Sequence, residues 1–184
     1  MANSAVFLDR DGTLNVDTGY VYRAEDWEWI PGAIDAIALL KRAGFLVILV
    51  TNQAGIARGL YEERDLARLH ARVSADVTAS GASIDGFYHC PHHPDFGTKE
   101  KCKCRKPLPG MIHQASSEFD IDLKRSWLVG DKASDIQAGL AAGVSPILVG
   151  TGYGREHRPQ VGNAVPYVKD VWHACSLILS KRFA

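Results

Sequence analysis

Short apolar runs recur along the chain and alternate with stretches of helical periodicity. The clearest runs span residues 5–8, 46–50, 127–129 and 146–149, and a weaker one spans residues 84–89. They are too short for core helices, so we interpret them as strands buried on both faces. Strands that alternate with helices predict right-handed crossovers and a parallel sheet. We therefore expect an α/β fold with a doubly wound, mainly parallel sheet and helices on both faces.

The segments between these runs place apolar residues on one helical face. Ile34, Ile37 and Leu40 share a face of a segment that Gly44 would end. A longer apolar stripe runs through residues 66–77 and ends near a glycine at position 81. Three further helices are expected, at residues 109–119, 134–142 and 171–181.

Length and composition limit the classes of protein that the chain can belong to. A chain of 184 residues with 46% hydrophobic content can bury one good core, so we expect a single domain over residues 1–184. Lysine and arginine total 21, as do aspartate and glutamate, and this neutral balance argues against a nucleic-acid partner. We expect a monomer.

The expected compartment is the cytoplasm, without a membrane partner. No signal peptide is readable, and no apolar run reaches the ~20 residues that a membrane span needs. Four cysteines in such a chain suggest reduced thiols rather than disulfides.

The first apolar run ends in two carboxylates. Asp9 and Asp11 stand two positions apart, so in an extended chain they would project from one face while Arg10 turns away. Gly12 allows a sharp turn, and Thr13 can satisfy local backbone groups. Ligands of doubly wound sheets bind beyond the carboxyl ends of the strands, which favours a site here. Taken alone, the pentapeptide could also be an ordinary turn.

Polar residues follow the other apolar runs as well, and two adjacent cations precede the third predicted helix. Each has a plain structural explanation; Ser134, for example, could cap the next helix. Their joint placement at one edge of one sheet favours a functional site. The residues concerned are Thr51, Asn52, Gln53, Arg105, Lys106, Asp131 and Asp135.

The set Asp9-x-Asp11-Gly12-Thr13, Thr51-Asn52, Lys106 and Gly130-Asp131 with Asp135 resembles the four motifs of the haloacid-dehalogenase-like phosphatase superfamily. The resemblance covers nearly the whole chain. It implies a phosphatase that hydrolyses a small phosphorylated metabolite through a phosphoryl-aspartate.

Phosphoryl transfer gives each of these residues an expected role. A carboxylate that attacks a phosphate anion needs a cation between them, which favours Mg²⁺ on Asp9 and Asp131, and the resemblance adds the backbone carbonyl of Asp11. Asp9 would attack phosphorus, and Asp11 would first donate and later accept a proton. That role needs a raised pKa of Asp11, which the Asp9 carboxylate and burial would favour. Lys106 and Arg105 would stabilise the charge on phosphorus, Thr51 and Asn52 would fix the group, and Asp135 would orient Asp131 or Lys106.

Two short Cys and His pairs form a second candidate site. They are Cys90-Pro91-His92 and Cys102-Lys103-Cys104, within a loop of about residues 89–106. Four such ligands suit tetrahedral zinc, although the spacing is tighter than Cys-x-x-Cys and unliganded thiols are the alternative. A zinc-loop branch of the superfamily has a loop of this form. The resemblance therefore implies that Cys90, His92, Cys102 and Cys104 hold structural Zn²⁺ and brace Arg105 and Lys106, with His89 and His93 outside.

The chain has no room for the inserted cap domain with which many superfamily members choose substrates, so loops must do that work. The zinc-loop branch includes heptose-bisphosphate and histidinol-phosphate phosphatases, and the loops are most similar to the former. This similarity implies that the substrate is a phosphorylated sugar, an intermediate in the synthesis of nucleotide-activated heptose for lipopolysaccharide. Histidinol phosphate stays an alternative, and a non-catalytic zinc-braced binding module a remote one. The expected substrate contacts are Asp17, Thr18, Gly19, Tyr20, Asn52, Gln53, Ala54, Arg105, Lys106 and Lys132, with Ala54 standing where many relatives have Ser.

Overall fold

The structure, a computed structural model, describes residues 2–97 and 102–182. Within these residues one six-stranded sheet has the strand order β3-β2-β1-β4-β5-β6, and neighbouring strands run parallel throughout. The expected doubly wound α/β class is confirmed. The strands are β1 (Ala5–Leu8), β2 (Leu46–Asn52), β3 (Gly86–Cys90), β4 (Trp127–Gly130), β5 (Ser145–Val149) and β6 (Tyr167–Val168).

The chain reverses its direction of progress across the sheet at β1. The strands β2 and β4 flank β1, with Leu8 in register with Leu49 on one side and Val129 on the other. The carboxyl ends of these three central strands therefore meet at one edge, where a doubly wound sheet binds its ligand. All four β1 residues are fully buried, as their apolar run predicts.

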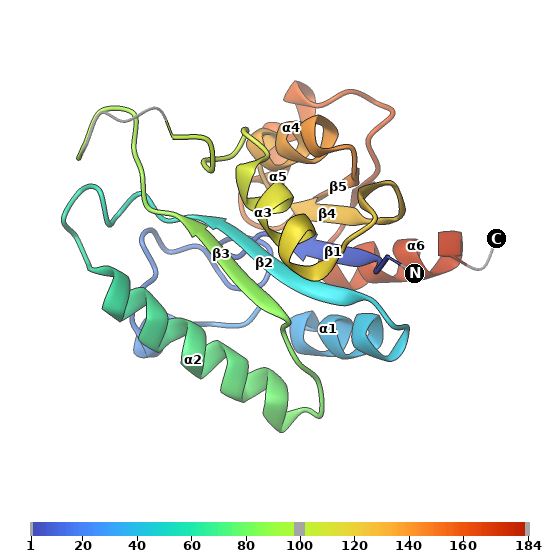
Figure 1. Cartoon of the computed structure of the whole chain (residues 1–184), viewed down its shortest axis with the longest axis horizontal. Helices are drawn as coiled ribbons and strands as arrows, with labels where there is room; N and C mark the ends of the chain where they lie inside the picture. The colour runs from blue at the N-terminus through green and yellow to red at the C-terminus, as the bar shows by residue number, and fades with distance from the viewer. Residues whose placement is uncertain (1, 98–101, 183–184) are drawn as a thin grey trace.

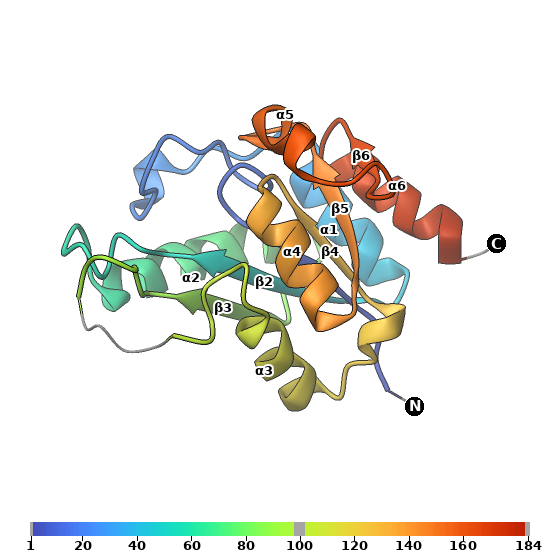
Figure 2. The same cartoon turned by 90° about the horizontal axis from the view of Figure 1, so that it is seen from above.

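Helices cover both faces of the sheet (Figure 1). Residues of α1 and α6 pack with Leu8, Leu49 and Val149 on one face. Residues of α3 and α4 pack with Phe7 and Val50 on the other face, which is the side of the sheet turned toward the viewer in Figure 2. The helices are α1 (Ala33–Arg42), α2 (Glu63–Ala79), α3 (Gly110–Phe119), α4 (Ala133–Ala142), α5 (Gly154–His157) and α6 (Val171–Arg182). Short 3-10 turns are η1 (Ala24–Asp26), η2 (Leu123–Arg125) and η3 (Arg158–Gln160).

The long elements follow the hydrophobic pattern, and the differences lie at element ends. The strand β2 continues through Asn52, so two predicted site residues belong to a strand rather than to a loop. The helix α4 begins at Ala133 with Lys132 as its N-cap, so the predicted cap at Ser134 is wrong; the Asp135 side chain accepts from the Lys132 backbone N–H instead. The short elements α5 and β6 had no periodicity to predict them. Among the described residues, no helix combines the length and apolar content needed to cross a bilayer.

Candidate active site

A buried lysine joins two of the predicted carboxylates beyond the end of β1. The Lys106 Nζ lies 2.5 Å from Asp9 Oδ1 and 2.7 Å from Asp135 Oδ1, and it donates to the Val50 carbonyl oxygen at 2.8 Å. The exposed fractions of the three charged side chains are 3%, 7% and 1%. Burial raises the pKa of Asp9 to about 6 against the opposing charge of Lys106. Lys106 thus places one positive charge between two buried carboxylates, and Asp135 contacts Lys106, one of its two expected partners.

The fourth charged residue, Asp131, has an oxygen without a partner. Its Oδ2 accepts a hydrogen bond from the Tyr153 backbone N–H at 2.8 Å, whereas its buried Oδ1 has no hydrogen-bond partner. Burial, and next the charge of Asp9, raise the pKa of Asp131 to about 8. Carboxylate oxygens of Asp9, Asp131 and Asp135 lie within 4.8 Å of one another. A buried, unsatisfied oxygen beside a second carboxylate suits a hard divalent cation, so these residues fit the expected metal.

Two glycines form the cradle around Asp131. A Cβ atom at Gly12 would lie 2.3 Å from Asp131 Oδ2, and one at Gly152 would lie 2.2 Å from the same atom. Both glycines have positive φ angles, 91° and 53°. Backbone from the β1 and β5 ends can approach this carboxylate only because neither residue has a side chain. Gly152 was not among the predicted site residues, although it follows the apolar run at residues 146–149 and could have been found from that position.

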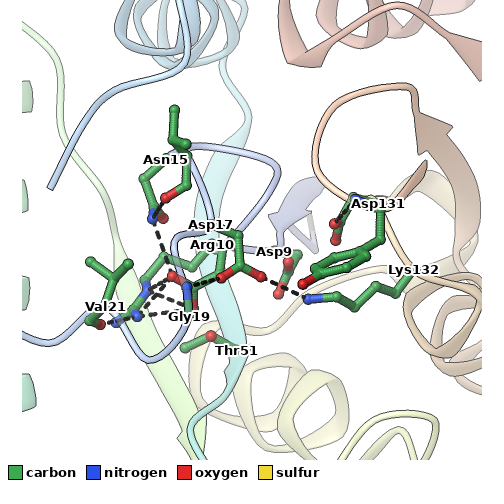
Figure 3. A network of polar contacts seen from close by, with 12 residues as sticks. Asp9, Arg10, Asn15, Asp17, Gly19, Val21, Thr51, Asp131 and Lys132 are labelled. Carbon is green, nitrogen blue, oxygen red and sulfur yellow. Dashed lines mark hydrogen bonds and ion pairs between the residues drawn. The ribbon is translucent and has the colours of Figure 1, made fainter. Parts of the chain in front are cut away.

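The alternation of side chains along a strand predicted that Arg10 would point away from Asp9 and Asp11. That prediction is wrong, because the Arg10 guanidinium returns to Asp11. Arg10 is fully buried, its Nη2 donates to Asp11 Oδ1 at 2.9 Å, and its Nε lies 3.1 Å from both Asp11 oxygens (Figure 3). Burial alone would raise the pKa of Asp11, but the charge and hydrogen bonds of Arg10, with hydrogen bonds from Asn15 and Gln53, lower it below its usual value. The expected upward shift of the Asp11 pKa is therefore wrong.

Gln53 links Asp11 to the end of β2. Its Nε2 donates to Asp11 Oδ2 at 2.9 Å and to Thr51 Oγ1 at 2.8 Å, and its Oε1 accepts from the Tyr61 hydroxyl at 2.5 Å. Asn52 instead holds the backbone of Lys106, accepting from its N–H at 3.0 Å and donating to its carbonyl at 3.1 Å. The end of β2 thus fixes both the second carboxylate and the lysine.

A cavity of about 390 Å³ opens beside these residues. On one wall, Asp17 forms an ion pair of 3.3 Å with Lys132, whose ammonium also lies 4.8 Å from the centre of the Tyr153 ring (Figure 3). Asp17 also accepts from the Gly19 backbone N–H at 3.0 Å, which shapes the turn that presents Tyr20. The lining residues are Asp11, Asp17, Gly19, Tyr20, Asn52, Gln53, Ala54, Tyr61, His93, Arg105, Lys132 and Tyr153.

The cavity contains most, but not all, of the predicted substrate contacts. Thr18 is exposed and does not line it. Lys106 does not line the cavity either. Its side chain is buried, and its backbone N–H donates to Asn52, which does line the cavity. Tyr61, His93 and Tyr153 line it without having been predicted. Tyr153 could have been found because it follows a strand end, whereas Tyr61 and His93 arrive through loop packing that no sequence pattern indicates.

The predicted Cys and His ligands come together in the loop after β3. The Cys102 Sγ lies 3.4 Å from Cys90 Sγ and 3.1 Å from Cys104 Sγ, and His92 Nδ1 lies 3.5 Å from Cys90 Sγ and 3.4 Å from Cys104 Sγ. Ligands about 2.3 Å from a tetrahedral zinc ion are about 3.7 Å apart, so this cluster has nearly the dimensions of a zinc site. Residues 98–101 of the expected zinc loop lie outside the described residues.

The same cluster positions the cation that precedes Lys106. The Arg105 backbone N–H donates to Cys102 Sγ at 3.2 Å, and its guanidinium donates to the His92 carbonyl oxygen at 3.2 Å. Both contacts attach Arg105 to the Cys and His cluster while its side chain lines the cavity. The expected bracing of Arg105 therefore has a direct structural basis.

Comparison with known proteins finds relatives over most of the chain. A family model described as HAD-hydrolase-like matches residues 103–174. The D-glycero-beta-D-manno-heptose-1,7-bisphosphate 7-phosphatase of Yersinia pestis is 49% identical over 152 residues, which cover 80% of this chain and 81% of that protein. The protein of the same name from Escherichia coli K12 is 44% identical over 168 residues, or 89% and 87% of the two chains. The crystal structure of a D,D-heptose 1,7-bisphosphate phosphatase from B. bronchiseptica, complexed with magnesium and phosphate, has a TM-score of 0.89 at 36% identity and covers 97% of this chain and 99% of that one.

Proposed function

This chain belongs to the HAD-like phosphatase family of the D-glycero-beta-D-manno-heptose-1,7-bisphosphate 7-phosphatases, and we propose that it hydrolyses the 7-phosphate of D-glycero-D-manno-heptose 1,7-bisphosphate. Its place would be the synthesis of nucleotide-activated heptose for lipopolysaccharide. The observation that carries the proposal is the buried arrangement of Asp9, Lys106 and Asp135 beside the unsatisfied oxygen of Asp131.

We assign the divalent cation, Mg²⁺, to Asp9, Asp131 and the backbone carbonyl of Asp11. The unpartnered Asp131 Oδ1 and its proximity to Asp9 support this assignment. A cation held there would supply positive charge between the nucleophile and the phosphate. We do not assign Asp135 as a metal ligand, because one of its oxygens contacts Lys106 Nζ and the other accepts from the Lys132 N–H at the start of α4.

In the proposed first step, a carboxylate oxygen of Asp9 attacks phosphorus as the bond to the sugar oxygen breaks. The leaving oxygen takes a proton from Asp11, and the phosphoryl group remains on Asp9. In the second step water attacks phosphorus, gives its proton to Asp11 and releases inorganic phosphate and the free Asp9 carboxylate. Lys106 orients Asp9 before the reaction, and its charge stabilises the negative charge on the phosphoryl oxygens.

The assignment of Asp11 to proton transfer takes account of its partners. Arg10 holds the pKa of Asp11 below its usual value and so keeps the carboxylate ionised, which suits the base of the second step. To act as the acid, Asp11 must first bind a proton. A phosphate dianion beside it favours this, because a neighbouring like charge raises the pKa of a carboxyl group. If Asp11→Asn keeps full turnover of a substrate with a poor leaving group, the assignment of Asp11 is wrong.

The cavity supports a substrate that is larger than its scissile phosphate. Arg105 and Lys132 provide positive charge on its wall, and we assign them to the distal phosphate. Asp17, Gly19 and Tyr20 are assigned to the sugar hydroxyls. The ion pair between Asp17 and Lys132 disfavours histidinol phosphate, because it occupies the carboxylate that a substrate amine would need.

We assign Zn²⁺ to Cys90, His92, Cys102 and Cys104, in a structural role. The crowding of three sulfur atoms and one ring nitrogen supports this, and metal analysis of the purified protein tests it. Thiolate ligands require a reducing environment, which fits the proposed cytoplasmic location. We also propose a monomer with one phosphatase domain over residues 1–184, which light scattering of the purified chain would test.

Phosphate release from a panel of substrates tests the proposed function. The panel contains both anomers of the heptose bisphosphate, fructose bisphosphate and histidinol phosphate, each with Mg²⁺ and with chelator. We expect selective, magnesium-dependent hydrolysis of the heptose bisphosphate. Equal rates across the panel would refute the substrate assignment, and a clear preference for histidinol phosphate would replace it.

A further inference from the structure

Three loops meet at the carboxyl end of the sheet. A side chain of one loop contacts both of the other two. We call the loops the entrance loop (residues 15–23), the middle loop (residues 53–61) and the zinc loop, whose described residues are 89–97 and 102–106. Figures 1 and 2 both show their described parts at this same end of the molecule. The side chain is Arg58 of the middle loop, which does not line the cavity.

Arg58 holds the entrance loop through Tyr20. Its Nη1 donates a hydrogen bond to the Tyr20 hydroxyl, and its guanidinium lies 5.8 Å from the centre of the Tyr20 ring. Tyr20 has a φ angle of 51°, a left-handed conformation that a residue with a side chain seldom adopts. Such a conformation persists where surrounding contacts hold it, and Arg58 supplies one of them.

Arg58 also holds the zinc loop through Phe96. The guanidinium lies 4.4 Å from the centre of the Phe96 ring, within the range of a cation–π interaction. The backbone of the two loops is close at the same place: the Ala57 N–H donates to the Pro91 carbonyl oxygen at 3.2 Å, and a Cβ atom at Gly97 would lie 3.3 Å from Ala57 Cβ. Arg58 therefore connects to the entrance loop and the zinc loop at once.

Further contacts show that the middle loop is where the entrance loop rests. A Cβ atom at Gly55 would lie 3.0 Å from the Tyr20 ring and 2.2 Å from the Tyr61 ring, so both rings lie against this glycine. The Tyr22 ring stacks on Tyr61 at 4.7 Å between centroids. No ion pair with a carboxylate holds Arg58 in residues 2–97 and 102–182, so its partners here are aromatic.

We propose that Arg58 is a positioning residue that fixes the entrance loop and the zinc loop over the cavity, and thereby sets the affinity for the sugar part of the substrate. This inference deepens the proposed function and rests on it. It assigns to Arg58 no contact with either phosphate. The Tyr20 ring, once fixed, presents one wall of the cavity to the sugar, while the reacting groups around Asp9 lie below and are unaffected by Arg58.

The first test measures loop order without a substrate. Hydrogen–deuterium exchange of the free enzyme is compared for wild type, Arg58→Ala and the control Arg68→Ala, which removes an exposed arginine of α2. We expect faster exchange in residues 15–23 for Arg58→Ala alone. Equal exchange in the two variants would overturn the proposal.

The second test separates positioning from direct phosphate binding. For Arg58→Ala we expect KM to rise about fivefold to tenfold, the combined scale of one exposed cation–π contact and one hydrogen bond. The rise should be the same for heptose 1,7-bisphosphate and heptose 7-phosphate, with kcat and the KM for p-nitrophenyl phosphate unchanged. Tyr20→Phe should give part of this rise, and the two substitutions should not be additive.

Other results would contradict the proposal in distinct ways. A rise confined to the bisphosphate would make Arg58 a direct ligand of the 1-phosphate instead. A fall in kcat on every substrate would show a general structural defect. If the wild-type enzyme does not hydrolyse either heptose phosphate, the proposed function fails, and the exchange experiment still decides whether Arg58 orders the loops.

Discussion

The carboxylate site and the Cys and His cluster differ in what holds their like-charged ligands together. At the carboxylate site, the Lys106 ammonium lies between Asp9 and Asp135 and pairs with both carboxylates. In the cluster, Cys102 lies within 3.4 Å of two other sulfur atoms, and the hydrogen-bonding partner is the backbone N–H of Arg105. The sheet therefore builds the first site largely without its cation, whereas the second depends on the ion that its four ligands would share.

This difference indicates what each metal would do. Loss of the cation from the carboxylate site would leave one unsatisfied oxygen, on Asp131, and intact geometry around Lys106. Loss of zinc would leave the four ligands without the ion that binds them together, and Arg105 would then lose the contacts that position it. We therefore expect the first metal to govern chemistry and the second to govern the shape of the cavity.

The largest expected effect tests the carboxylate site at Asp9, the proposed nucleophile. Asp9→Asn should lower kcat by at least about a thousandfold, because an amide cannot form the phosphoryl intermediate. The melting temperature should change little, since the side chain keeps its shape and Lys106 keeps Asp135. Steady-state phosphate release and a thermal melt measure the two quantities. An Asp9→Asn protein that still turns over would move the nucleophile elsewhere.

A second variant tests whether Lys106 is what holds this site together. Lys106→Met should lower kcat about a hundredfold to a thousandfold through loss of charge on the phosphoryl oxygens. It should also lower the free energy of unfolding by about 3–5 kcal/mol, because two buried carboxylates lose their partner. Urea unfolding with chelator present measures the second effect, and Lys132→Met serves as the control for a less buried cation. A stable Lys106→Met protein would contradict the comparison between the two sites.

The Cys and His cluster should respond differently to the loss of one ligand. Cys102→Ser should reduce bound zinc and raise KM for the heptose bisphosphate about tenfold, the lower scale for disturbed metal-site support. The kcat value should fall far less than in Asp9→Asn, since the nucleophile is untouched. Metal analysis, kinetics and a melt of the same preparation provide the measurements; Cys175→Ser is the matched control for a thiol outside the cluster. A zinc-free variant with wild-type KM would contradict the proposal that zinc positions Arg105.

A further expected effect is a pH dependence of the chelator-treated protein. The pKa of Asp131 is near 3.8 when unfolded and about 8 when folded, so between these values the folded chain holds the extra proton. The free energy of unfolding should therefore fall as pH rises from about 4 to about 8. Magnesium should restore more stability at pH 8 than at pH 5, because it binds the deprotonated carboxylate. An Asp131→Asn protein with the same pH slope in urea titrations would contradict this assignment.

The sequence predicted the sheet and the convergence of the charged residues for a physical reason. Buried strands must be apolar on both faces, and parallel strands place Asp9, Thr51 and Asp131 at one edge, whatever the loops do. The convergence of Cys90, His92, Cys102 and Cys104 was predicted from the family resemblance, because the spacing of the two pairs alone left unliganded thiols as an alternative.

Side-chain partners within the site could not be predicted in the same way. Alternation along a strand gave the initial direction of Arg10, but not its return to Asp11, which depends on Val21 and Gln53 also accepting from its Nη2. The downward shift of the Asp11 pKa follows from that packing. Residues 153 and 61 reach the cavity through turns whose course depends on tertiary contacts, and so their contribution needed coordinates.

The glycine cradle of Asp131 has a consequence for tolerance to amino-acid exchange. Position 152 belongs to no proposed reaction step, yet a Cβ there would come within 2.2 Å of Asp131 and 2.6 Å of the Gly12 backbone. In a library that carries every substitution at position 152 and is selected for heptose bisphosphate phosphatase activity, every replacement of glycine should be depleted, including alanine. Natural sequence drift should be blocked there in the same way, which would make a loop glycine as diagnostic of the active lineage as the aspartates themselves.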